Sequence, residues 1–108
     1  MSYAVFLTEG AENDLVSIYN YIYEHDAPGR ADHVLHQIES TFSRLADLPE
    51  RGSYPKELAA LGIHEYREVL FKPYRIVYRV VKKTVFIMLI IDGRRDMQTL
   101  LQRRLLDG

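Results

Sequence analysis

The chain has 108 residues, no cysteine and a formal net charge of −1. This length fits one domain, and the absence of cysteine excludes disulfide bonds and thiolate metal sites, as expected in a reducing compartment such as the cytoplasm. The longest apolar run, Val85 to Ile91, is far shorter than the roughly 20 residues that cross a bilayer, and the first residues lack the basic start of a signal peptide. We therefore expect one cytoplasmic domain, residues 1–108, with no membrane partner.

Charge is distributed unevenly along the chain. Residues 1–62 carry ten acidic and four basic side chains, a balance of −6, whereas residues 63–108 carry five acidic and ten basic ones, a balance of +5. The basic half suggests an anionic partner, either nucleic acid or an acidic protein segment. The alternative is that each half is a solvated surface that neutralises the other.

The first half of the chain predicts one strand and two helices. Tyr3–Leu7 is rich in strand-forming residues, and Thr8 follows as an N-cap. Two apolar stripes at three- and four-residue spacing then predict amphipathic helices. The stripes are Ala11, Leu15, Ile18, Tyr19 and Ile22, and then Ala31, Val34, Leu35, Ile38, Phe42 and Leu45. Pro28 and Gly29 separate them, which predicts an antiparallel helix hairpin.

The second half predicts three strands and a terminal helix. After a loop over 49–62 that holds one helical turn, the period changes to two, and strands are expected over 64–70, 74–80 and 85–92. The leucine-rich stretch 96–106 predicts the last helix. The sequence thus predicts an α+β fold in the order β-α-α-β-β-β-α, with a small, mostly antiparallel sheet packed on the helix hairpin.

Basic residues are expected to gather on one face of this sheet. Alternation in the strand 74–80 turns its bulky residues toward the helices and leaves its arginines on the open face. The candidate residues for binding an anion or the target are Arg67, Arg75, Arg79, Arg94 and Arg95. Converging guanidinium groups can hold phosphates or carboxylates bidentately. Alternatively, these arginines are solvated and pair at the surface with Glu65 and Glu68, for about 0–1 kcal/mol each.

Histidines and the terminal leucines are the remaining candidates. His64 begins the first strand of the sheet and could act as an acid or base near the arginines. His33 and His36 have the spacing of metal ligands but lack a third ligand, so neither a metal nor another cofactor is expected. Leu100, Leu101, Leu105 and Leu106 together exceed what a small terminal helix can bury unaided. They either pack on the sheet, which we expect for Leu100 and Leu101, or form a docking site for an amphipathic partner segment, which we expect for Leu105 and Leu106.

Three segments resemble the RelE/ParE superfamily of type II toxins: Glu65–Glu68, Phe71–Val80 with its YRIVYRV core, and Ile91–Asp96 with its DGRRD end. The order of elements matches as well. The resemblance implies a toxin that is neutralised by a cognate, ParD-like antitoxin, whose acidic and apolar segment wraps around it, so a hetero-oligomer is expected. The candidate antitoxin-binding residues are Leu101, Leu105, Leu106, Arg103 and Arg104.

The branches of this superfamily differ in their targets. RelE-type toxins cleave mRNA in the ribosomal A site, and ParE-type toxins bind DNA gyrase and have no known catalytic residues. Arg75 and Arg95 fall on two arginines of the RelE pattern, and Arg67 falls on a lysine. If the chain is a ribosome-dependent mRNA endonuclease, its catalytic set is Arg75, Arg95, Arg67 and His64.

Two positions depart from the RelE pattern. A second lysine is replaced by Val69, or by Glu68 if the register slips, and the tyrosine of the last helix is replaced by Leu101. Cleavage through a 2′-hydroxyl needs groups that accept and donate protons, and arginine is a poor proton carrier at neutral pH. The resemblance therefore favours a ParE-like gyrase inhibitor over a RelE-type ribonuclease. A third alternative is a non-toxic binding module or a decayed toxin.

Overall fold

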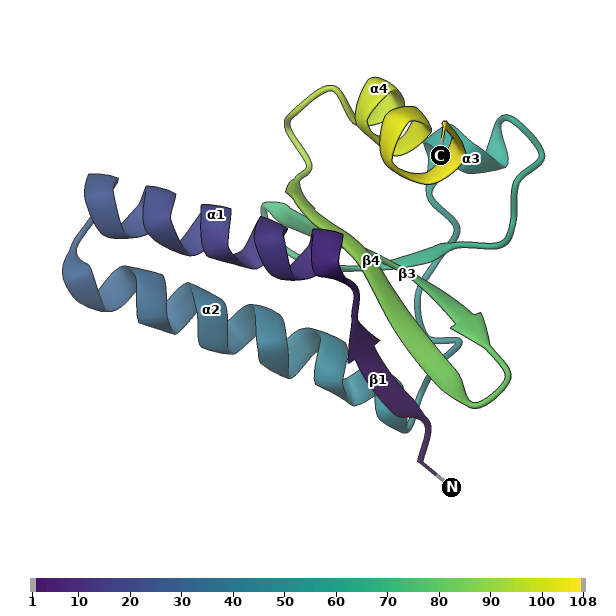
Figure 1. Cartoon of the computed structure of the whole chain (residues 1–108), viewed down its shortest axis with the longest axis horizontal. Helices are drawn as coiled ribbons and strands as arrows, with labels where there is room; N and C mark the ends of the chain where they lie inside the picture. The colour runs from purple at the N-terminus through teal and green to yellow at the C-terminus, as the bar shows by residue number, and fades with distance from the viewer. Residues whose placement is uncertain (1, 108) are drawn as a thin grey trace.

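A computed structural model, which describes residues 2–107, shows a four-stranded sheet between two layers of helices (Figure 1). The strands are β1 (Ala4–Leu7), β2 (Arg67–Phe71), β3 (Tyr74–Val81) and β4 (Thr84–Asp92). They lie in the order β1-β4-β3-β2, with β1 parallel to β4 and the other pairs antiparallel. The predicted α+β fold with a mostly antiparallel sheet is confirmed.

The helix hairpin forms where its two apolar stripes predict it. α1 (Glu9–His25) begins at Thr8, whose Oγ1 accepts a hydrogen bond from the Ala11 N–H at 3.3 Å, so the predicted N-cap is confirmed. α2 (Pro28–Ser43) begins at Pro28, which needs no donor in the first turn, and continues into a 3₁₀ turn, η1 (Arg44–Ala46).

The hairpin packs on one face of the sheet and forms the main core. Side chains from both helices meet side chains from β2, β3 and β4 there. The buried members of this core are Ala11, Leu15, Ile22, Ala31, Val34, Ile38, Leu45, Val69, Ile76, Tyr78, Val85, Ile87 and Ile90. Ile76 and Tyr78 of β3 thus face the helices, as their parity predicts.

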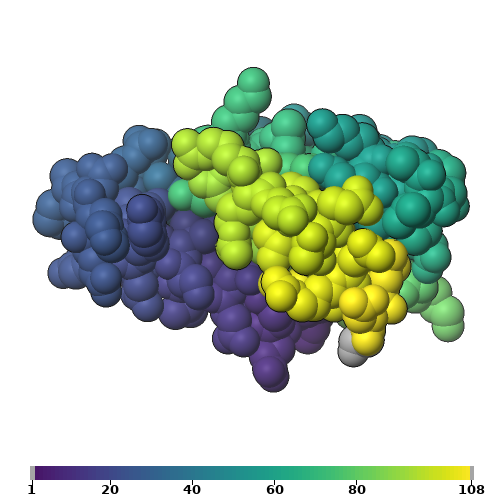
Figure 2. All heavy atoms as spheres, turned by 90° about the horizontal axis from the view of Figure 1, so that it is seen from above, coloured from purple at the N-terminus to yellow at the C-terminus, as the bar shows by residue number. Residues whose placement is uncertain are grey.

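The other face of the sheet is covered, which corrects the expectation of an open face. A one-turn helix, α3 (Lys56–Ala59), and the terminal helix α4 (Met97–Leu101) lie over it. They form a second core of Leu58, Tyr66, Val77, Leu89, Ile91, Met97, Leu100 and Leu101. The reason is visible in β4: a nearly continuous apolar strand must be covered on both faces. Figure 2 shows this layer from outside, with the C-terminal segment beside the segment around residues 50–60.

The C-terminal segment is tied to the sheet at a β-bulge. The register between β3 and β4 shifts by one residue, which leaves Met88 as the extra residue of β4. Beyond α4 the chain continues as a π-helical segment, η2 (Gln102–Leu106), whose Arg104 donates to both carboxylate oxygens of Asp14 at 3.0 Å and to the Met88 carbonyl at 3.3 Å. Asp14 also accepts the Ile90 N–H at 2.9 Å, so α1, β4 and η2 share one polar junction.

Within residues 2–107, no helix has the length and the apolar character that a membrane crossing requires.

Candidate functional site

Arg75 is held inside the protein by two carboxylates. Its Nη1 and Nη2 donate to the two carboxylate oxygens of Glu57 at 2.9 and 2.7 Å, and its Nε donates to Glu68 at 2.7 Å. The three side chains are only 12–13% exposed. Hydrogen bonds from Arg75 lower the pKa of Glu57, and hydrogen bonds to Glu57 raise the pKa of Arg75. We call this cluster, Arg75 with Glu57 and Glu68, the Arg75 triad.

The Arg75 triad occupies both guanidinium edges that could bind an anion through two hydrogen bonds. Glu57 takes the Nη1–Nη2 edge and Glu68 takes Nε of the other edge, so three of the five N–H donors meet carboxylate oxygen, and the triad as a whole carries one negative charge. Gly93 closes over the side chain, since a Cβ there would lie 2.8 Å from Arg75 Cδ. The expectation of a solvent-facing Arg75 is therefore wrong. Glu57 from α3 and Glu68 from β2 bind its guanidinium group and cover it.

The remaining arginines of the expected cationic face are scattered. Arg94, whose side chain is 78% exposed, pairs with Asp92 at 2.6 Å and lowers the pKa of that carboxyl through its hydrogen bonds. Arg95 is exposed and forms no ion pair within residues 2–107. Arg79 and Glu65 lie 3.8 Å apart at the surface, as in the alternative of weak surface pairs.

Arg67 braces the loop that precedes α3. Its Nη1 donates to the carbonyl oxygens of Gly52 at 2.8 Å and Glu50 at 3.3 Å, and its Nη2 donates to the Tyr54 hydroxyl at 3.2 Å. Its guanidinium lies 4.6 Å from the centre of the Tyr54 ring. The sequence places Arg67 correctly on the strand beside β3, but its guanidinium group donates its hydrogen bonds to the loop.

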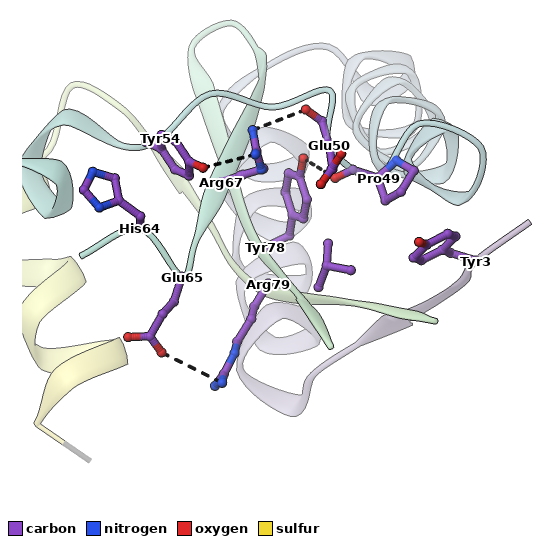
Figure 3. A pocket seen from close by; sticks show the side chains of 10 residues that line it. Tyr3, Pro49, Glu50, Tyr54, His64, Glu65, Arg67, Tyr78 and Arg79 are labelled. Atoms are coloured by element: carbon purple, nitrogen blue, oxygen red, sulfur yellow. Dashed lines mark hydrogen bonds and ion pairs between the residues drawn. The ribbon is translucent and has the colours of Figure 1, made fainter. Parts of the chain in front are cut away.

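A pocket of about 310 Å³ lies beside Arg67 (Figure 3). The exposed ring of His64 meets the Tyr54 ring edge-on, with centroids 4.9 Å apart, and Arg79 lines the opposite part of the pocket. An imidazole and a phenol thus lie near guanidinium groups, which is the arrangement that RNA cleavage would require. Two carboxylates, Glu50 and Glu65, line the same pocket and balance the charge of its two arginines.

Tyr78 forms the floor of this pocket and is a structural residue. Its hydroxyl donates to the Pro49 carbonyl at 2.8 Å and accepts the Gly52 N–H at 2.9 Å. Burial raises the pKa of this phenol, so it stays protonated and is poorly suited to accept a proton. Gly52 is required at this position because a Cβ would lie 2.5 Å from the Glu68 carbonyl oxygen.

The candidate ribonuclease set is thus not brought together in one pocket. His64, Arg67 and Arg79 line the pocket of Figure 3, whereas Arg75 and Arg94 line a shallow hollow of about 570 Å³ beside Pro73. A third hollow of about 460 Å³, between α1 and the end of β4, is lined by Arg94 and Arg95.

The expected antitoxin-binding residues divide into buried and exposed groups. Leu101 is 0% exposed in the second core, as its expected packing on the sheet predicts, so its assignment as an antitoxin contact is corrected. Leu105 packs against the same core, and Arg104 forms an ion pair with Asp14. Leu106, 39% exposed, and Arg103 remain at the surface.

A family model described as "ParE toxin of type II toxin-antitoxin system, parDE" matches residues 5–97 of this chain. The chain belongs to this ParE toxin family. A curated relative, Toxin ParE3 of Caulobacter vibrioides, is 28% identical over 100 residues, which cover 93% of this chain and 96% of that protein.

Solved structures with this fold include both ParE- and RelE-type systems. A chain of the chromosomal ParDE system of P. aeruginosa superposes with a TM-score of 0.71 at 21% identity, over 84% of this chain and 96% of that one. A chain of the RelBE2 toxin–antitoxin complex of Mycobacterium tuberculosis gives 0.58 at 22% identity, over 85% and 99%. A mutant of E. coli toxin RelE in the free state gives 0.64 at 16% identity, over 98% and 100%. At these identities the likenesses show the fold of this ParE-family chain.

Two structural features of this ParE-family toxin were not expected from the sequence. Glu57 lies 18 residues before Arg75 in the segment predicted as a loop, and nothing in its neighbours marks it as a partner. Asp14 gives a weak signal, because it sits within one turn of the apolar positions Ala11 and Ile18 on a helix face that the sheet partly covers.

Proposed function

We propose that this ParE-family toxin inhibits DNA gyrase, and thereby replication, by binding the enzyme rather than by cutting RNA. The observation that carries the proposal is the Arg75 triad. The arginine that a RelE-type ribonuclease would use on the scissile phosphate is here bound on three donors by Glu57 and Glu68.

The physical reason is electrostatic competition. A phosphate could bind the Arg75 guanidinium through two hydrogen bonds only by displacing Glu57 or Glu68 from charge-assisted hydrogen bonds of 2.7–2.9 Å. Both carboxylates would remain nearby and repel the phosphate. At the position where the RelE pattern has tyrosine, Leu101 is buried and carries no titratable group. Around Arg75 the protein therefore offers binding without proton transfer, and a gyrase inhibitor needs no more.

Separate measurements of DNA and protein synthesis test this target. We expect induction of the toxin in cells without antitoxin to stop thymidine incorporation while methionine incorporation continues through the first generation. A gyrase inhibitor acts on the template, whereas an A-site nuclease acts on the message. Immediate loss of methionine incorporation with continued thymidine incorporation would refute the proposal. Uninhibited growth would instead support the non-toxic alternative.

The proposed partner in the cell is a ParD-like antitoxin. Its acidic, amphipathic segment would meet the exposed cations Arg95 and Arg103 and the exposed Leu106. We expect Leu106→Asp to weaken the toxin–antitoxin complex by about tenfold or more, since it places a charge into an apolar contact. Leu61→Asp, at a leucine that is 53% exposed, is the matched control and should leave affinity unchanged. Equal affinities for the two variants would exclude this part of the surface.

The pocket of Figure 3 keeps ribosome-dependent mRNA cleavage as a second candidate. It joins the His64 imidazole, the Tyr54 phenol and two guanidinium groups in one hollow. Primer extension on translated mRNA decides between the two: cuts that appear with the wild-type toxin and vanish with His64→Ala would establish the nuclease. We expect no new cuts with either protein.

A further inference from the structure

Helix α1 is more apolar than its contacts with the sheet and α2 require. Its inward face buries Ala11, Leu15 and Ile22, yet Val16 and Tyr23 on an outward face remain 58% and 57% exposed. Apolar side chains that remain exposed beside one another on an amphipathic helix mark a surface that a partner can cover. Some of this surface is therefore available to a partner.

A groove between α1 and α2 collects this exposed apolar surface. It contains a hollow of about 200 Å³ lined by Leu15, Val16, Tyr19, Asn20 and Leu35. The Tyr19 and Tyr23 rings stack with centroids 6.0 Å apart and extend the apolar surface by one helical turn. We call this surface the hairpin groove.

The Tyr19 ring is fixed in the groove by α2. Its hydroxyl donates to Asp32 at 2.8 Å, across the two helices. Because this hydrogen bond orients the Tyr19 ring, and Tyr23 stacks on it, the Tyr19 side chain has little conformational freedom left to lose when a partner binds. The faces of the two tyrosine rings can also attract a cation.

The charged residues beside the hairpin groove are acidic. Glu12 lies one turn before Val16 on α1, and Asp32 and Glu39 lie three residues before and four residues after Leu35 on α2, so helical spacing places all three along the groove. All three are exposed, and within residues 2–107 none of them forms an ion pair. The groove therefore joins an apolar floor to a negatively charged rim.

We propose that the hairpin groove binds an amphipathic helix of a partner protein whose apolar stripe is flanked by lysine or arginine. The stripe would fill the hollow between α1 and α2, and its cations would meet the Glu12, Asp32 and Glu39 carboxylates. The groove is thus a second interaction surface, opposite in charge to the exposed arginines Arg95 and Arg103.

The acidic rim also selects among occupants. A second copy of this chain, docked through the same groove, would bring its own three carboxylates close to these three, with no cation between them. An acidic antitoxin segment would meet the same repulsion, so the proposal is independent of where the antitoxin binds and of the gyrase target. A cationic amphipathic helix can cover the apolar floor of the groove and also pair with the carboxylates of its rim.

The probes are three synthetic peptides of about 18 residues, long enough for five helical turns. One is an amphipathic Leu/Lys helix, the second replaces its Lys by Glu, and the third is a scrambled Leu/Lys peptide of equal charge. We expect the first to shift the backbone amide NMR signals of residues 12–23 and 32–39. The scrambled and Leu/Glu peptides should bind at least about tenfold more weakly, because each loses one of the two complementary features.

Two tyrosines of α1 supply matched variants. Tyr23 stacks on Tyr19 at the hairpin groove, whereas Tyr21, 66% exposed, lines the hollow on the other side of the helix. We expect Tyr23→Ala to weaken binding of the Leu/Lys peptide by about fivefold or more and Tyr21→Ala to leave it unchanged, with circular dichroism confirming that both variants fold. Glu12→Lys with Glu39→Lys should reverse the preference, in favour of the Leu/Glu peptide.

Several results would overturn the proposal. They are equal affinities for the patterned and scrambled Leu/Lys peptides, amide shifts that map outside the groove, and equal effects of the two tyrosine variants. Light scattering could instead detect a dimer of the wild-type chain that Tyr23→Ala dissociates. This result would assign the groove to a second copy of the chain and would also reject the proposal.

Discussion

The Arg75 triad gives the sharpest prediction about this protein, because its stability and its function can be separated. In Glu57→Gln the amide can still accept one hydrogen bond from Arg75, but its NH₂ group faces the other guanidinium donor. The lost charge-assisted hydrogen bond is worth about 1.5–3 kcal/mol, and Glu68 still neutralises the arginine, so we expect a loss of about 2 kcal/mol in the free energy of unfolding. Arg75→Ala leaves two carboxylates, each 12–13% exposed, without a cation and should cost about 3–5 kcal/mol.

A charge-free triple variant separates these effects. Arg75→Met combined with Glu57→Gln and Glu68→Gln removes the ion pairs without leaving an unpaired charge, and its stability should lie within about 1 kcal/mol of wild type. Urea unfolding at neutral pH measures all three proteins. Growth arrest should survive in the triple variant, since the triad is structural. If Arg75→Ala keeps wild-type stability but abolishes growth arrest, Arg75 acts on the target and the reasoning fails.

Three further predictions concern the framework. Arg104→Ala should lower the free energy of unfolding by about 2 kcal/mol, because it leaves the part-buried Asp14 carboxylate without its cation, and amide hydrogen exchange should accelerate first in residues 102–106. Tyr78→Phe should cost about 1–2 kcal/mol in urea unfolding by removing the acceptor of the Gly52 N–H, whereas wild-type stability would show that water replaces it. Because Glu57 has a lowered pKa, its contribution to stability is complete above the ordinary value of 4.5 and is lost as pH falls further, so the stability gap between wild type and Glu57→Gln should be constant near neutrality and narrow below pH 4.5.

Local pattern accounts for most of the fold. The apolar stripes of the two long helices, the Thr8 N-cap and the Pro28 start follow from side-chain chemistry within a few residues. The change to a two-residue period places β3 and turns Ile76 and Tyr78 toward the hairpin. These features depend on neighbours in sequence, so the sequence alone predicts them.

The covered second face and the site chemistry depend on contacts between distant residues. The leucine-rich terminus favours packing of Leu101 on the sheet, whereas Leu58 lies in a segment that gives a weak helical signal. The three-dimensional arrangement shows that the two residues together cover β3 and β4. The same holds for Glu57, which reaches Arg75 because α3 packs over the sheet. The sequence identifies the arginines as the important cations. Which of them is free to bind a target depends on their partners in space: Arg75 is bound by Glu57 and Glu68, whereas Arg95 is exposed.

Purified components show whether this ParE-family chain acts on gyrase by binding, as proposed. Relaxed plasmid, gyrase and ATP are incubated with increasing amounts of the toxin, and the DNA is resolved after detergent and protease treatment. We predict that supercoiling is inhibited and that linear, gyrase-cleaved DNA accumulates with the dose of toxin. Complete supercoiling at a large molar excess of folded toxin, with no linear product, would contradict it.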